Sequence, residues 1–115
     1  MCSPEELKQV LSEVTAELRV IFGGKLENVI LYGSYARGDA DDESDIDVMA
    51  LISGVSRENL CLYDQAVSRA LSRIEQKWDY DVLLSLILED VPTFEKYADD
   101  MAFFRNVRRE GISVV

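Results

Sequence analysis

Two aspartates at the start of an apolar run carry the clearest chemistry in this sequence. Asp45 and Asp47 are two positions apart, and apolar residues 48–52 follow them directly. Alternate side chains of a strand leave the same face, so both carboxylates are expected on one face. Carboxylates this close repel each other, and a shared divalent cation removes that repulsion. Because Mg²⁺ prefers one or two carboxylates together with phosphate oxygens, the pair predicts a magnesium site. The competing interpretation is an exposed strand edge.

A glycine and a serine end the preceding apolar run, at Gly33 and Ser34. Gly33 lets the backbone approach a phosphate with no Cβ in the way. Ser34 offers a hydroxyl and an amide, and a helical turn after it would add partial positive charge. Arg37 can neutralise a phosphate through two parallel hydrogen bonds, or it can pair with the acidic loop that follows it. Beside a metal site, this turn predicts binding of nucleotide phosphates.

A third carboxylate on a neighbouring strand would complete a site for phosphoryl transfer. Two metal ions about 4 Å apart can hold both the attacking and the leaving oxygen of such a reaction. Residues 80–88 read as a third strand, with Asp81 inside it and Asp79 just before it. Asp81 is preferred because burying a charge within an apolar run costs free energy unless the charge is paired or binds a metal. The choice between the two aspartates stays open.

Other classes of site fit the sequence poorly. Gly33 and Gly38 have the spacing of a P-loop, but Asp39 stands where that motif needs lysine. The acidic loop that begins at Asp39 lacks the turn glycine and the closing glutamate of a calcium loop. The chain has no histidine and its two cysteines lie far apart, so a zinc site and a histidine base are disfavoured.

Length and charge narrow the classes of protein. A chain of 115 residues is expected to form one domain, residues 1–115. The net charge of −10 disfavours extended contact with nucleic acid, and it fits binding of Mg²⁺ or of a basic partner, or solubility alone. No apolar run is long enough to cross a membrane, and the acidic N-terminus is unlike a signal peptide. A cytoplasmic protein is therefore expected.

The elements that position these residues follow from periodicity and turn signals. They alternate between helix and strand, which predicts a small α/β (α+β) domain whose mixed sheet is packed with helices. The expected helices are residues 4–22, 56–77 and 93–109, the expected strands are 26–32, 45–52 and 80–88, and residues 112–115 form a short strand or a docking tail.

The combined pattern resembles the minimal nucleotidyltransferase family of the DNA polymerase β superfamily. The resemblance rests on G-S-Y-A-R-G-D-A followed by S-D-I-D-V, and it extends to the ending N-V-R-R-E-G-I. It implies that Gly33 and Ser34 bind the nucleotide phosphates and that Ser44 belongs to the nucleotide-binding set. It also implies that Asp45 and Asp47 hold metal, with Asp81 as third metal ligand and base.

The resemblance implies a polymerase β-like fold and transfer of AMP from ATP, with Mg²⁺, to a hydroxyl group. In small members of this family the acceptor is often a tyrosine of a HEPN-type toxin, for which the transferase acts as the antitoxin. The chain is too short to hold an acceptor domain of its own, so a homo- or hetero-oligomer is possible. Two alternatives stay open: a non-catalytic module that masks a partner, and a small-molecule nucleotidyltransferase completed by a partner subunit.

Overall fold

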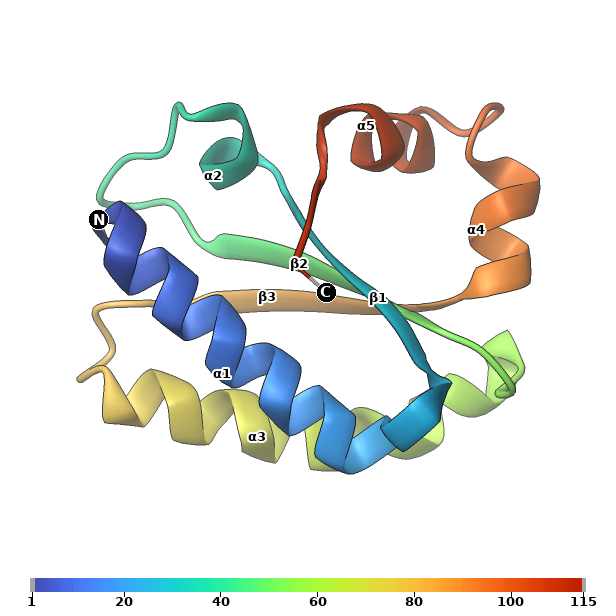
Figure 1. Cartoon of the computed structure of the whole chain (residues 1–115), viewed down its shortest axis with the longest axis horizontal. Helices are drawn as coiled ribbons and strands as arrows, with labels where there is room; N and C mark the ends of the chain where they lie inside the picture. The colour runs from blue at the N-terminus through green and yellow to red at the C-terminus, as the bar shows by residue number, and fades with distance from the viewer. Residues whose placement is uncertain (1, 115) are drawn as a thin grey trace.

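The computed structural model describes residues 2–114, which form a four-stranded sheet with helices on both faces (Figure 1). No helix in this range is long and apolar enough to cross a bilayer. The elements in chain order are α1 Pro4–Phe22, η1 Gly23–Lys25, β1 Leu26–Tyr32, α2 Ser34–Arg37, β2 Ile46–Ile52, η2 Arg57–Tyr63, α3 Asp64–Lys77, β3 Leu84–Asp90, α4 Val91–Tyr97, α5 Ala102–Glu110 and β4 Ile112–Ser113. The expected fold class, a mixed sheet packed with helices, is confirmed.

The sheet has the strand order β3-β2-β1-β4. β1 runs antiparallel to both β2 and β4, whereas β2 and β3 are parallel. The register places Tyr32 of β1 opposite Asp47 of β2. On the other side of β2, Asp47 pairs with Ser85 of β3. Asp47 therefore occupies an interior strand, with one neighbour from each adjacent strand.

Two hydrophobic cores fill the two faces of the sheet. On β2, Ile46 and Val48 contribute to the core under α1 and α3, whereas Met49 and Leu51 contribute to the core under α4 and α5. This alternation is the period of two that a strand covered on both faces requires. It also fixes the orientation of Asp47, because an odd-numbered residue of β2 points toward the α4–α5 face.

The first helix starts where its sequence predicts. The hydroxyl of Ser3 accepts from the Glu6 amide at 3.2 Å, and the Glu6 carboxylate accepts from the Ser3 amide at 2.9 Å. This capping box satisfies two amides that a helix start leaves without partners. Figure 1 shows α1 beside α3, and ion pairs join them from Glu17 to Arg73 and from Glu13 to Lys77.

Two of the three expected helices are each divided. Residues 56–77 form the 3₁₀ helix η2 and then α3, and Ser56 makes no side-chain capping bond. Residues 93–109 fall into α4 and α5, separated by a turn in which the amides of Asp100 and Met101 both donate to the carbonyl of Tyr97. The prediction of one continuous C-terminal helix is therefore wrong. The break lets α5 turn back across the sheet.

The expected third strand is displaced along the chain. It spans Leu84–Asp90 rather than residues 80–88, and it is a half-buried strand at the edge of the sheet. Asp79 and Tyr80 have positive φ angles of 53° and 60°, so the chain turns there and cannot be extended. Asp81 consequently lies in the turn before β3, where it is exposed, and its placement in the strand is wrong.

Gly111 offers a test of how closely the end of α5 packs on β1. A Cβ at this position would overlap the Val107 carbonyl oxygen and the Ile30 side chain, whereas a Cβ at Gly24 would meet nothing. We expect Gly111→Ala to lower the free energy of unfolding by about 1–3 kcal/mol, the usual cost of overpacking. Urea denaturation measures it, with Gly24→Ala as the control that loses no stability. Equal effects of the two substitutions would contradict the close packing.

Candidate active site

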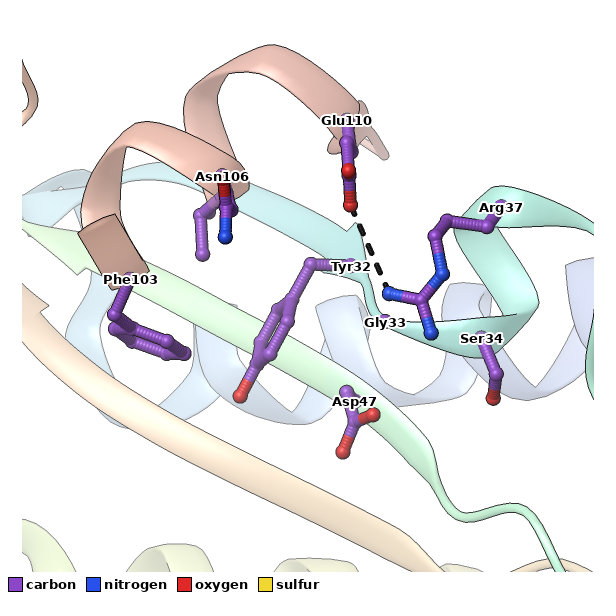
Figure 2. A pocket seen from close by; sticks show the side chains of 9 residues that line it. Tyr32, Gly33, Ser34, Arg37, Asp47, Phe103, Asn106 and Glu110 are labelled. Atoms are coloured by element: carbon purple, nitrogen blue, oxygen red, sulfur yellow. Dashed lines mark ion pairs between the residues drawn. The ribbon is translucent and has the colours of Figure 1, made fainter.

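A pocket of about 340 Å³ opens between the turn after β1 and the helix α5. This volume lies at the lower end of the range for sites that hold one small ligand. Figure 2 shows side chains from β1, α2, β2 and α5 around the opening. The lining residues are Tyr32, Gly33, Ser34, Arg37, Asp47, Phe103, Asn106, Val107 and Glu110. The predicted Gly-Ser turn, Arg37 and Asp47 thus lie around one pocket.

Gly33 and Asp47 are in close contact at the base of this pocket. Gly33 has φ 74° and ψ −154°, a backbone conformation that essentially requires glycine. A Cβ at Gly33 would also overlap the Asp47 carboxylate. The sequence predicts a glycine that leaves space for a phosphate, whereas the structure shows that the missing Cβ leaves space for the Asp47 carboxylate. Ser34 follows as the first residue of α2, half-buried at the pocket wall.

The carboxyl group of Asp47 is held in an environment that disfavours its charge. Partial burial raises the pKa of Asp47, and the nearby charge of Asp45 raises it further, while Arg37 acts in the opposite direction. An acid that is desolvated beside a second acid is stabilised by a bound cation. Asp45 and Asp47 are therefore a donor set that suits one divalent ion of the magnesium type.

Arg37, the last residue of α2, pairs with two acidic side chains. Its Nε lies 3.3 Å from Oδ2 of Asp39, and its Nη1 lies 3.7 Å from Oε2 of Glu110. The side chain is exposed and lines the pocket. Arg37 thus pairs with the acidic loop, as one of its two sequence interpretations expects, and it also lines the pocket. That Arg37 neutralises a phosphate stays a prediction. Exposed pairs of this kind contribute at most about 1 kcal/mol, so a stronger anion can displace them.

Two aromatic side chains form the wall opposite Ser34. The rings of Tyr32 and Phe103 meet edge to face, with centroids 5.6 Å apart. Figure 2 shows the Tyr32 ring lying between Phe103 and Asp47. Partial burial raises the pKa of the Tyr32 hydroxyl, and the Asp47 charge adds to the effect. A neutral aromatic surface beside acidic and polar groups suits a ligand with one flat apolar part and one charged part.

Asp45 and Ser44 belong to the loop before β2 and do not line the pocket. Asp45 is exposed, one residue before the strand, and its charge reaches Asp47. The Ser44 hydroxyl accepts from the Asp41 amide at 2.9 Å and donates to the Asp41 carboxylate at 3.2 Å. In this structure Ser44 shapes the acidic loop that delivers Asp45. Its role in binding nucleotide stays a prediction.

Asp81 is not brought beside Asp47. It faces a different hollow, together with Cys2, Glu6 and Trp78. Within residues 2–114, no group of three or more acidic, cysteine or histidine side chains is arranged to hold a metal ion. Asp79 is likewise exposed in the turn before β3. The assignment of a third carboxylate from this segment therefore stays a prediction without structural support.

The sequence interpretation did not assign Asn106 or Glu110 of α5 to the site. Phe103, Asn106 and Glu110 are spaced three and four residues apart, which places them on one side of the helix, and all three line the pocket. Phe104 and Val107 occupy the buried side. The N-V-R-R-E-G-I ending contains Asn106 and Glu110, so this motif was the sequence feature that could have indicated them.

Comparisons with known proteins agree with the geometry. Residues 11–107 match the family model described as "Nucleotidyltransferase domain". The chain belongs to this nucleotidyltransferase family. The resemblance to minimal nucleotidyltransferases is thereby confirmed.

Two relatives of this nucleotidyltransferase come from Methanocaldococcus jannaschii, and each is named "putative protein adenylyltransferase". One is 34% identical over 110 residues, covering 95% of this chain and 99% of the relative. The other is 30% identical over 104 residues, covering 90% and 93%. This chain thus spans nearly the whole length of both relatives.

Solved structures share the fold at lower identity. A "putative nucleotidyltransferase" from Sulfolobus solfataricus has a TM-score of 0.57 and 23% identity, covering 93% of this chain and 74% of that one. A chain of a toxin–antitoxin structure with AMP-PNP also has a TM-score of 0.57, with 19% identity and coverage of 91% and 72%. These similarities establish the fold of the nucleotidyltransferase.

The contact between Gly33 and Asp47 can be measured by a double-mutant cycle. We expect Gly33→Ala to destabilise the nucleotidyltransferase strongly, and to cost less when Asp47→Ala has already removed the carboxylate. A coupling energy of about 0.5–3 kcal/mol is typical of residues in contact. Gly38→Ala is the control, because Gly38 also has a positive φ but no neighbour that its Cβ would meet. Coupling of equal size at Gly38 would contradict the contact.

The raised pKa of Asp47 predicts that the stability of the protein depends on pH. A carboxyl group whose pKa is raised by folding destabilises the folded state as pH rises above about 4, because the folded protein holds the proton more tightly than the unfolded chain does. We expect Asp47→Asn to unfold at a higher urea concentration than the wild type near pH 7, with the difference vanishing near pH 3. Asp100→Asn controls for net charge. If the two proteins differ by the same urea concentration at every pH in this range, folding does not raise the pKa of Asp47.

Proposed function

We propose that the protein is a magnesium-dependent adenylyltransferase that moves AMP from ATP to a tyrosine hydroxyl of a partner protein. The observation that carries this proposal is the convergence of Gly33, Ser34, Arg37 and Asp47 around one pocket, in a chain of the nucleotidyltransferase family. The names of the Methanocaldococcus relatives support protein as the acceptor class.

Each residue has a defined task in this mechanism. Ser34 and the backbone at Gly33 bind the triphosphate, and Arg37 neutralises part of its charge. Asp45 and Asp47 hold Mg²⁺, which supplies positive charge to the phosphate oxygens when bound. The acceptor oxygen forms a bond to the α-phosphorus and passes its proton to solvent water. The bond from the α-phosphorus to the oxygen that bridges the α- and β-phosphates breaks, and pyrophosphate leaves with that oxygen and its electron pair. The chain's own contribution is positioning and charge stabilisation.

The aromatic wall is assigned to the nucleoside part of ATP. Tyr32 and Phe103 present an edge-to-face pair on the side of the pocket away from Ser34. A base can stack on such a surface, while the phosphates reach the Gly-Ser turn. The pocket has a volume suited to one small ligand, which leaves the acceptor to approach from outside the chain.

The proposed partner is a HEPN-type toxin, for which this protein would serve as antitoxin. Support comes from the resemblance to minimal nucleotidyltransferases and from the toxin–antitoxin structures that share its fold. The net charge of −10 favours a partner with a basic surface. We further propose that the chain acts as a single domain in the cytoplasm.

The test is transfer of label from ATP to protein. The chain is incubated with α-³²P-ATP, Mg²⁺ and a lysate of the source cells, and labelled protein is identified by mass spectrometry. We expect AMP on a tyrosine of one protein, and a loss of at least 100-fold in rate for Asp47→Asn, typical of removing charge stabilisation. Asp100→Asn, an exposed aspartate far along the chain, is the matched control.

Binding measurements separate this proposal from a module that only masks its partner. Calorimetry with α,β-methylene-ATP is run with Mg²⁺ and with EDTA. A transferase binds the analogue in a metal-dependent way, and Asp47→Asn abolishes the dependence. If the wild type shows no metal-dependent binding, or if Asp47→Asn transfers label as fast as the wild type, the proposed activity is wrong.

A further inference from the structure

The strand register identifies the residue that stands beside Asp47 on β3. Asp47 pairs with Ser85, and their Cα atoms belong to adjacent parallel strands. Adjacent strands lie about 4.8 Å apart, a separation that lets two neighbouring side chains share one ligand. The position next to the metal-binding candidate therefore carries a neutral hydroxyl group.

Ser85 shares the face of Asp47. Its chain neighbours Leu84 and Leu86 both pack against the core under α1 and α3. Because side chains of a strand alternate, Ser85 points to the other face, which is the face of Asp47. Ser85 is only half-buried, and β3 is the edge strand of the sheet, so an approaching molecule has access to this position.

The Asp81 side chain lies on a different side of the sheet from Asp47 and Ser85. Pairing between β2 and the β3 segment begins where the Ile46 amide donates to the Leu83 carbonyl, two residues after Asp81. Asp81 lines a hollow with Cys2, Glu6 and Trp78, and Cys2 and Trp78 both pack on the core under α1 and α3. Asp81 thus lies toward the α1–α3 side, whereas Asp47 lies toward α5.

We infer that this chain supplies two metal-binding carboxylates, Asp45 and Asp47, and that Ser85 occupies the place from which a third would reach. The chain with bound nucleotide therefore holds one divalent ion, not two. This inference rests on the proposed function, because it assumes that Asp45 and Asp47 bind a metal–nucleotide complex. Its physical basis is charge: a hydroxyl group does not offset the mutual repulsion of two dications, whereas a third carboxylate does.

The experiment counts bound ions. Mn²⁺ replaces Mg²⁺ as the probe, the chain and α,β-methylene-ATP are equimolar, and the electron paramagnetic resonance signal reports free Mn²⁺ during a titration. We expect about one tightly bound Mn²⁺ per wild-type chain and about two for Ser85→Asp. Ser85→Asn, which has a similar size but no charge, should remain at one. Asp81→Asn should also remain at one.

The outcomes separate the inference from the proposed function. Two ions on the wild type overturn the inference, and a fall from two to one in Asp81→Asn would assign the third carboxylate to Asp81. A folded Ser85→Asp that still binds one ion also overturns it. If Ser85→Asp does not fold, the numbers of Mn²⁺ bound by the wild type and by Asp81→Asn still show whether the chain holds one ion or two. Failure of the proposed function looks different: the wild type then binds no metal–nucleotide complex at all.

Discussion

The contact between the Asp47 carboxylate and the backbone of Gly33 is the constraint on which the site depends. Antiparallel pairing brings the end of β1 to the start of β2, with Tyr32 opposite Asp47. The chain must then change direction at Gly33 without overlapping the Asp47 carboxylate. Only glycine permits both the required φ and the required space. The Gly33–Ser34 turn and the start of β2, which carries Asp47, are therefore positioned by the same contact.

Local signals in the sequence were enough to predict the parts that local interactions determine. The helix α1, the strand β1 and most of β2 lie where predicted, because helix and strand periodicity act over a few residues. β3 was misplaced because residues 80–83 are as apolar as a strand, and only the left-handed turn at Asp79 and Tyr80, together with pairing to β2, decides where it starts. No short-range pattern encodes that register.

The side of the pocket formed by α5 is a second feature that local sequence patterns could not predict. The chain changes direction at the break between α4 and α5 (Figure 1), and Gly111 then allows it to pass close to Ile30 before β4 begins. Phe103 and Glu110 reach the pocket only because of this path. Helical periodicity can place both residues on one side of a helix, but it cannot say that this side faces a site more than fifty residues earlier in the chain.

Arg37 stands in an opening whose remaining charges are negative. It is the one basic residue lining the pocket within the described part of the chain, and it is flanked by Asp39 and Glu110, with Asp47 nearby. A bare polyphosphate approaching this opening would meet more negative than positive charge, within the field of a chain whose net charge is −10. The charge around the opening is therefore unfavourable for an anion that carries no counterion, and a counterion on the anion reduces that cost.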